Sequence, residues 1–409
     1  MEIWLAGVLA LYMAWAIGAN DVANAMGTSV GSGALTVTGA IIVAASLEFS
    51  GAFLAGGHVT DTVRKGMLDM ELVSGDELLH GMLAALTSAA TLLLGATRLG
   101  LPVSTTHAIV GAIVGFGAVA IGPEAVNWGK VGQIVASWLT SPLLSGVLAF
   151  LIFQLTRSVV LDKENPIREV RRVGPFFFFY VFFIIGLVTL FKGLKNLNLD
   201  LNLPQALAGS VLLGLVGAAI GWFFLSRVKE GKEDRDHRFS QVERIFVVLQ
   251  ILTACAVAFA HGSNDVANSI GPLAAIVSVV EGGGEVVGKS AVRPWMLAVG
   301  GLGIVFGLAT WGYRVMETVG KRITELTPSR GFAAELAAAT TIVLASRLGI
   351  PVSTTHTLVG AVLGVGIARG IGALDMRVVG NIVVSWVATL PIAAGLAIFF
   401  YYFFKGLLS

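Results

Sequence analysis

The chain has 409 residues, of which 56% are hydrophobic and 13% charged, and its formal net charge is +2. Soluble domains carry about a quarter charged residues, so in water this chain would need one implausibly large apolar core. The small net charge argues against a nucleic-acid partner. The single cysteine, Cys255, excludes an internal disulfide framework and a cysteine-based metal cluster. The composition indicates an all-α integral membrane protein whose main partner is the lipid bilayer.

Apolar runs long enough to cross a bilayer recur from end to end. The chain is apolar from Ile3 onward and lacks a basic leading segment, so we interpret its start as a membrane span and not as a signal peptide. Pro175–Phe191 and Pro204–Leu225 are two later runs of spanning length. We expect about five spans in each half and two between them, about 12 in all.

Three blocks of sequence occur twice, in the same order and at a nearly constant offset. The matches are Ala16–Ala25 with Ala260–Ser269 at seven of ten positions, Arg98–Ala112 with Arg347–Ala361 at twelve of fifteen, and Val131–Leu139 with Val379–Val387 at six of nine. Such agreement predicts an internal duplication. We divide the chain into repeat 1 (1–157), a central two-span hairpin with basic loops (158–242) and repeat 2 (243–409).

The charges of the loops predict that the two repeats are inverted. Leu155–Arg172 and Arg227–Arg244 are rich in lysine and arginine, which places both loops in the cytoplasm. An odd number of spans in each half then makes repeat 2 enter from the opposite face. The equivalent loops agree with this: His58–Leu78 has two basic and five acidic residues, whereas Arg314–Arg330 has four basic and two acidic. We expect a multi-pass protein of the cell membrane with both termini outside.

The first duplicated motif places carboxylates and amides inside apolar spans. Asn and Asp side chains compete for backbone groups, so we interpret Gly18–Asn24 and Gly262–Asn268 as helix breaks whose carbonyls face a cation. A charge at the bilayer centre costs about 2.5–3.5 kcal/mol or more, and no intramembrane lysine or arginine is an evident partner. Bound cations or protons are the simplest partners. The predicted cation ligands are Asp21, Asn24, Asp265 and Asn268.

The second duplicated motif, Pro-Val-Ser-Thr-Thr-His, begins at Pro102 and again at Pro351. Proline followed by Ser and Thr is typical of a helix start, where free N–H groups and the helix dipole favour an anion. The predicted ligands of a tetrahedral anion are Ser104, Thr105, Thr106, Ser353, Thr354 and Thr355, helped by Asn20 and Asn264. Helix packing alone explains one Ser-Thr-Thr run about as well, but explains its recurrence with Asn-Asp pairs poorly.

Other polar residues near these motifs carry weaker signals. We interpret His107, His261 and His356 as capping or outer residues and not as direct ligands. Glu48 lies within an apolar span, which favours a functional role. Glu335 follows a turn and precedes an alanine-rich span, so it also fits a simple favourable acid near a helix start.

The duplicated Gly-Ala-Asn-Asp-Val-Ala-Asn, Gly-Ser-Asn-Asp-Val-Ala-Asn and Pro-Val-Ser-Thr-Thr-His motifs resemble those of the inorganic phosphate transporter (PiT) family. The resemblance covers both halves. It implies secondary transport of phosphate by an inverted-repeat fold, commonly as a homodimer. Asparagine before the aspartate is similar to the sodium-coupled branch. The resemblance further implies that Asp21 and Asp265 are essential and that Glu48 and Glu335 are functional acids.

Sodium-phosphate symport by alternating access is therefore the leading hypothesis, with inorganic phosphate and sodium ions as co-substrates and no other cofactor. The alternative is a proton- or divalent-metal-coupled phosphate or sulfate permease that uses the same site. An ion channel is a further class, which a current far above a carrier's turnover would indicate. An intramembrane enzyme is disfavoured, because catalysis has no need of two copies of every candidate residue.

Overall fold

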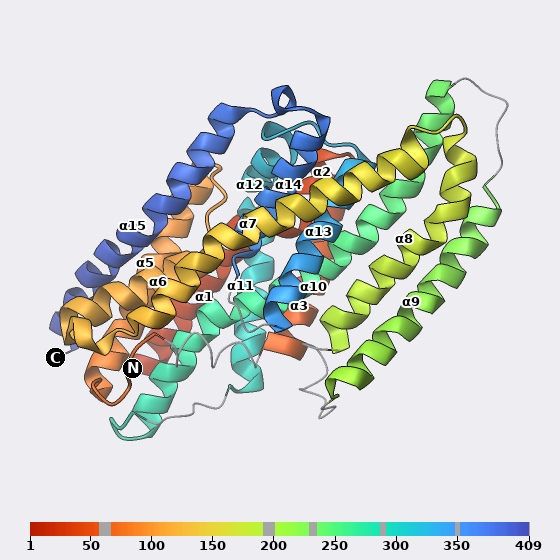
Figure 1. The fold of residues 1–409 in the computed structure, drawn as a ribbon. Coiled ribbons are helices and arrows are strands. Elements are labelled where there is room, and N and C mark those ends of the chain that lie inside the picture. Colours follow the sequence, from red (N-terminus) through yellow and green to blue (C-terminus); the bar gives the residue numbers. More distant parts are fainter. Residues whose placement is uncertain (57–66, 191–200, 229–234, 287–291, 348–351, 409) are drawn as a thin grey trace.

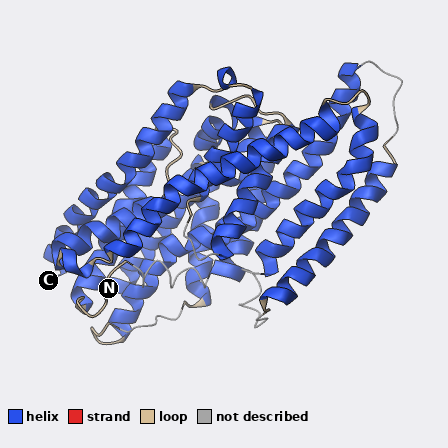
Figure 2. Cartoon of the chain, in the orientation of Figure 1, coloured by secondary structure: helices blue, strands red, loops and turns tan. Residues whose placement is uncertain are grey.

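A computed structural model describes residues 1–56, 67–190, 201–228, 235–286, 292–347 and 352–408. Apart from one isolated bridge between Leu68 and Val126, these residues form helices and loops (Figures 1 and 2). Some segments discussed above lie partly outside the described residues. They are the loops His58–Leu78 and Arg227–Arg244, and Pro351 of the second Ser-Thr-Thr motif.

The helices follow one another in three groups along the chain. The first group is α1 (Glu2–Asp21), α2 (Ala23–Gly31), α3 (Val37–Ala55), α5 (Gly75–Arg98), α6 (Thr105–Phe116) and α7 (Trp128–Thr156). The central pair is α8 (Pro166–Val188) and α9 (Leu203–Ser226). The last group is α10 (Arg235–Glu281), α11 (Pro294–Trp311), α12 (Tyr313–Glu317), α13 (Pro328–Arg347), α14 (Thr354–Arg369) and α15 (Met376–Leu408).

Nine helical segments of the described chain are long and apolar enough to cross a membrane, and Thr105–Ile121 is a shorter apolar helix. The prediction of an all-α, multi-pass membrane protein is confirmed. The described helices fall short of the expected count of about 12 full spans. One reason is that α14, which begins within the second Ser-Thr-Thr motif, has only 16 residues.

Side-chain caps define where several helices begin. Ser74 and Glu77 form a capping box at α5, and Asn202 and Gln205 form one at α9. Each box satisfies backbone N–H groups that have no partner within the helix. The beginnings of α5 and α9 therefore follow directly from the local sequence.

Glycines bring helices from the two ends of the chain into backbone contact. A Cβ added at Gly18 in α1 would lie 1.9 Å from the carbonyl oxygen of Ile304 in α11. A Cβ added at the equivalent Gly262 in α10 would lie 2.1 Å from the carbonyl oxygen of Glu48 in α3. Helix α1 thus packs on α11 as α10 packs on α3. Only glycine permits so close an approach of two helix backbones.

A second pair of contacts has the same reciprocal form. A Cβ at Gly111 in α6 would lie 2.8 Å from the carbonyl oxygen of Leu390 in α15, and one at Gly360 in α14 would lie 2.3 Å from that of Pro142 in α7. Gly111 and Gly360 are equivalent residues of the duplicated block. Helix α6 of the first half thus packs on α15 of the second half in the same way as α14 packs on α7.

The central pair lies at one side of the molecule. In Figure 1, α8 and α9 run side by side at the right, whereas the two termini lie close together at the lower left. Gly217 and Gly221 of α9 receive the rings of Phe182 and Phe178 of α8. Helix α8 packs closely on α9 and also contacts α10 and α13, where Phe177 meets Phe246 and Phe332.

Candidate ion and phosphate site

Asp21 ends α1 and accepts hydrogen bonds from both Ser-Thr-Thr motifs. Thr105 Oγ1 donates to one carboxylate oxygen, and Thr355 Oγ1 donates to the other at 3.3 Å. Asn24 Nδ2 lies 3.2 Å from the same Asp21 oxygen and 2.8 Å from Thr355 Oγ1. All four residues are buried. The fold thus joins three of the predicted segments at one carboxylate.

Asp265, the equivalent aspartate in α10, has similar partners. Thr354 Oγ1 lies 3.4 Å from Asp265 Oδ2, while Asn264 and Asn268 each donate to Oδ1 at 3.3 Å. Asp265 is buried, and Asn264 is half-buried. Both predicted groups of cation ligands are therefore brought against hydroxyls that were predicted to bind the anion.

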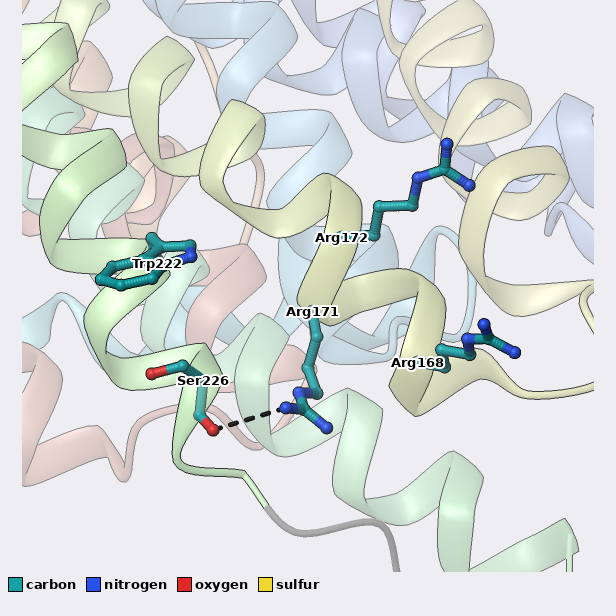
Figure 3. A pocket seen from close by; sticks show the side chains of 5 residues that line it. All are labelled: Arg168, Arg171, Arg172, Trp222 and Ser226. Carbon is teal, nitrogen blue, oxygen red and sulfur yellow. Dashed lines mark hydrogen bonds between the residues drawn. The ribbon is translucent and has the colours of Figure 1, made fainter.

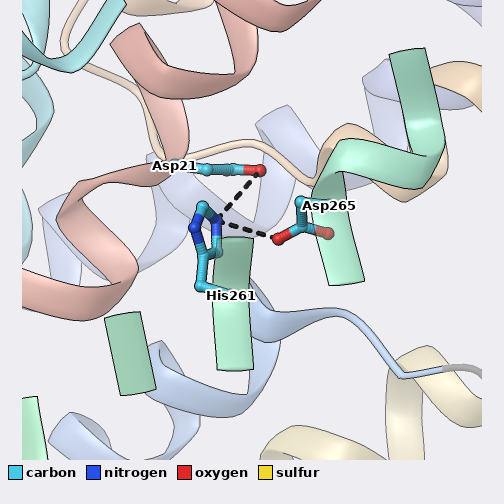
Figure 4. A group of neighbouring side chains, drawn as sticks. All are labelled: Asp21, His261 and Asp265. Atoms are coloured by element: carbon cyan, nitrogen blue, oxygen red, sulfur yellow. Dashed lines mark ion pairs between the residues drawn. The ribbon is translucent and has the colours of Figure 1, made fainter. Parts of the chain in front are cut away.

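His261 lies between the carboxylates (Figure 4). Its Nε2 is 2.8 Å from Asp265 Oδ2 and 3.9 Å from Asp21 Oδ2, and its Nδ1 is 3.3 Å from Glu48 Oε1. Asp21, His261 and Asp265 each offer one ligand atom within 4.8 Å of the others. Three buried carboxyl groups thus surround one imidazole, within 2.8 to 3.9 Å of its nitrogens.

The central place of His261 was missed by sequence reasoning, which gave this residue an outer role. Two signals were available. His261 is four residues before Asp265, so both lie on one face of α10. The first half of the chain has Ile17 at the equivalent position, so the histidine is a polar departure from the duplication.

The two serines of the Ser-Thr-Thr motifs cap the helices that they begin. Ser104 Oγ accepts from the N–H of His107 at 3.3 Å, and Ser353 Oγ accepts from the N–H of His356 at 3.2 Å. Each hydroxyl proton remains available to an anion. Thr106 is half-buried and makes no side-chain hydrogen bond with any described residue.

Asn20 holds the segment that leads into α6. Its Nδ2 donates to Thr97 Oγ1 at 3.0 Å and to the carbonyl of Leu101 at 3.1 Å. Its Oδ1 accepts from the N–H of Val103 at 3.2 Å. The amide thereby fixes the position of the first Ser-Thr-Thr motif relative to α1.

Glu335 forms a second buried acidic centre, in α13. Its Oε1 accepts from Thr28 at 2.5 Å and Ser29 at 2.7 Å, and its Oε2 accepts from Thr253 at 2.6 Å. Gln250 Nε2 is a further donor at 3.3 Å. No lysine, arginine or histidine of the described chain pairs with this carboxylate. Glu335 is fully buried and surrounded by neutral hydrogen-bond donors. Its surroundings are therefore more elaborate than those of an acid that only favours a helix start.

The predicted helix break at the second Asn-Asp motif is wrong, because α10 runs without interruption from Arg235 to Glu281. At the first motif the interruption is limited to Val22, whose φ of −55° and ψ of −27° remain helical. At the second motif Asn264 and Asn268 both donate to Asp265, and the helical backbone bonds stay intact. The extended residues instead precede α6 and α14, at Ser104 and Ser353.

His107 and His356 lie apart from the carboxylates, in a row of four rings. His107 stacks on Trp138 with ring centroids 3.3 Å apart, and His356 stacks on Trp386 at 3.7 Å. The two imidazoles meet edge to face at 4.3 Å. This row ties the beginnings of α6 and α14 to α7 and α15.

Apolar helices of spanning length, with a buried charged cluster to which both ends of the chain contribute, define a multi-pass membrane transporter. The chain belongs to the phosphate transporter family, whose model matches residues 17–397.

Individual relatives agree over nearly the whole chain. A Haemophilus influenzae protein named "Putative phosphate permease" is 46% identical over 409 residues, covering 100% of this chain and 97% of the relative. The chloroplastic inorganic phosphate transporter 2-1 of Arabidopsis thaliana is 44% identical, covering 97% of this chain and 71% of the plant protein. A solved structure described as the sodium-dependent phosphate transporter is 42% identical, with a TM-score of 0.89 and 99% of each chain covered.

Proposed function

We propose that the protein is a sodium-coupled symporter of inorganic phosphate. The observation that carries this is the cluster of Asp21, Asp265 and Glu48 around one imidazole, with threonine hydroxyls against the two aspartates. Buried charges need partners, so this cluster requires cations. The hydroxyls that face these carboxylates are donors suited to an anion. Cation and anion sites in contact explain why the two would travel together.

The cation ligands that we propose are Asp21, Asn24, Asp265 and Asn268. Sodium is a hard cation that prefers oxygen ligands, and carboxylates and amides supply them. Asn24 Oδ1 is buried and has no hydrogen-bond partner among the described residues. A buried unpaired acceptor costs about 1–3 kcal/mol, which a bound cation would remove. The name of the 42% identical structure supports sodium over other cations.

The phosphate ligands that we propose are the hydroxyls at the beginnings of α6 and α14, with help from two amides. These are Ser104, Thr105, Thr106, Ser353, Thr354, Thr355 and Asn264, while Asn20 helps by holding the segment that leads into α6. Free N–H groups and the positive dipole end of each helix favour an anion there. Contacts of Thr105 with Asp21 and of Thr354 with Asp265 support a site where both motifs meet.

We also propose an inverted duplication of residues 1–157 and 243–409 around the hairpin 158–242. The reciprocal contacts of Gly18 with Ile304 and of Gly262 with Glu48 support it, because a pseudo-twofold axis exchanges such pairs. Transport would then proceed by alternating access around the shared site. In this proposal the protein is a homodimer of the cell membrane with both termini outside. Glu48 and Glu335 are further functional acids.

Uptake of radiolabelled phosphate into proteoliposomes tests the coupling. A sodium gradient and a proton gradient are imposed in turn, each with and without unlabelled sulfate. We expect uptake that follows the sodium gradient and is insensitive to sulfate. Uptake that follows protons or requires a divalent metal would contradict sodium coupling and assign the protein to the alternative permease.

A further inference from the structure

Three arginines lie in the first turns of α8, at one end of the α8–α9 hairpin. Figure 3 shows Arg171 pointing toward Ser226, whereas Arg168 and Arg172 point to the other side, away from Trp222. Arg168, Arg171 and Arg172 come from the first turns of α8, and Trp222 and Ser226 come from the end of α9. Together they line a pocket of about 350 Å³. Arg171 Nη2 donates to the carbonyl oxygen of Ser226 at 3.5 Å, which holds the two helix ends together. We call these five residues the arginine pocket.

The arginine pocket has an excess of positive charge. Arg168 and Arg172 are exposed, and neither forms an ion pair with any residue that the structure describes. Glu169 is the one acid among residues 166–172. Guanidinium groups are planar, weakly hydrated and able to bind two oxygens of one phosphate group at once. The pocket therefore fits a phosphate-bearing anion.

Apolar side chains continue from the pocket toward the middle of the hairpin. Trp222 is 65% exposed, and Phe176, one turn beyond Arg172, is 58% exposed. Leu215 and Val211 extend the same exposed face of α9. An exposed tryptophan between charged residues and an apolar face is typical of the membrane–water interface. The arginines form a charged region at the end of the hairpin, and the exposed apolar face of α9 begins next to it. This order matches that of the headgroup and the acyl chains in a phospholipid.

We propose that the arginine pocket binds the phosphodiester headgroup of an anionic phospholipid. In the bound state the exposed side chains of Arg168 and Arg172 turn toward Arg171 to contact the lipid phosphate. Trp222 then lies beside the glycerol backbone, and one acyl chain follows Leu215 and Val211. The exposed apolar face selects a lipid over free inorganic phosphate, because the free ion would gain nothing from it. The site is separate from the carboxylate cluster and does not depend on the coupling ion.

Native mass spectrometry of the full chain, offered an equimolar mixture of phosphatidylglycerol and phosphatidylcholine, tests the proposal. The test variant is Arg168→Gln/Arg171→Gln/Arg172→Gln. The control, Lys130→Gln/Lys321→Gln/Arg377→Gln, removes the same charge elsewhere. Each basic residue near an anionic lipid strengthens binding about fivefold, so we expect the test variant to lose roughly tenfold or more of the phosphatidylglycerol preference. The control variant retains it.

A second readout tests the position of the lipid. Brominated phosphatidylglycerol is expected to quench the tryptophan fluorescence of the wild-type protein more than that of Trp222→Phe. Phosphate uptake in phosphatidylcholine vesicles verifies that each variant is folded.

Three results would overturn the proposal. One is an equal loss of lipid preference in both triple variants, which would indicate only bulk charge. Another is displacement of the lipid by millimolar inorganic phosphate, which would indicate a site for the free ion. The third is a test variant that shifts the protein between monomer and dimer with no change in lipid binding, which would indicate an interface between copies.

Discussion

Asp21 and Asp265 occupy equivalent positions in the duplicated motif, but their surroundings differ. Asp21 accepts from two threonines, Thr105 and Thr355, whereas Asp265 accepts from Thr354. His261 Nε2 lies closer to Asp265, at 2.8 Å, than to Asp21, at 3.9 Å. The imidazole has no equivalent in the first half, where Ile17 stands. The site is therefore asymmetric at the level of single residues, although the motifs that form it are duplicated.

Removing one carboxylate charge tests the cation site. We expect Asp21→Asn or Asp265→Asn to lower sodium-driven phosphate uptake at least about tenfold, because a cation loses a charged ligand while the side-chain shape is kept. Sodium is also expected to raise the unfolding temperature of the wild-type protein but not of these variants. Glu285→Gln, which changes an exposed acid beyond the end of α10, is the control. Full uptake by both aspartate variants would disprove the assignment.

Glu335 offers a test of the second acidic centre. In Glu335→Gln the amide nitrogen faces hydroxyl donors such as Thr253, so we expect a loss of about 1–3 kcal/mol in the free energy of unfolding. We also expect the sodium concentration for half-maximal uptake to rise several-fold, because a buried negative charge is lost. A sodium titration of uptake measures this. If the curve coincides with that of the wild-type protein, Glu335 is structural only.

At the scale of helices, the site depends on how closely the backbones approach. Gly262 lies against the carbonyl of Glu48 and is followed within one turn by Asp265. The contact therefore positions α10 and α3, which carry His261 and Glu48, so that their side chains meet. Gly262 therefore allows both the close packing of α10 on α3 and the contact between His261 and Glu48.

Substitution of this glycine is expected to separate the two helices. In Gly262→Ala the new Cβ would lie 2.1 Å from a backbone oxygen, so we expect a loss of about 1–3 kcal/mol in the free energy of unfolding. In the control, Gly7→Ala, the Cβ meets nothing within 4 Å and the better helix propensity of alanine stabilises α1 slightly. Unfolding of both variants in detergent measures the difference. Equal stability would show that α10 shifts freely relative to α3.

At the scale of the whole molecule, the inverted arrangement predicts which loops share a face of the membrane. In a Cys255→Ser background, Lys163→Cys and Lys321→Cys are expected to react with an impermeant maleimide only from the cytoplasmic face. Asp76→Cys is expected to react only from outside. All three positions are exposed in the structure. Labelling of all three from one face would rule out the proposed inversion.

Much of the fold follows from the sequence because membrane helices are dictated by local composition. The apolar runs, the duplicated blocks and the helix starts at Ser104 and Ser353 are local signals, and the structure has helices at each. The residue types of the site were also evident, because an unpaired carboxylate in an apolar span is conspicuous. These features need no knowledge of distant contacts.

Only the tertiary structure decided which of these residues meet. Asp21 and Thr355 are 334 positions apart, and His261 of α10 faces Glu48 of the neighbouring α3. The pairing of these residues therefore depends on how the helices pack. The unbroken course of α10 has the same origin. Local propensity predicts a break at Asn-Asp, but partners on neighbouring helices and on adjacent turns satisfy the polar groups, so the backbone has no need to open. The sequence by itself determined the membrane class and the chemistry of the site, whereas helix packing determined its geometry.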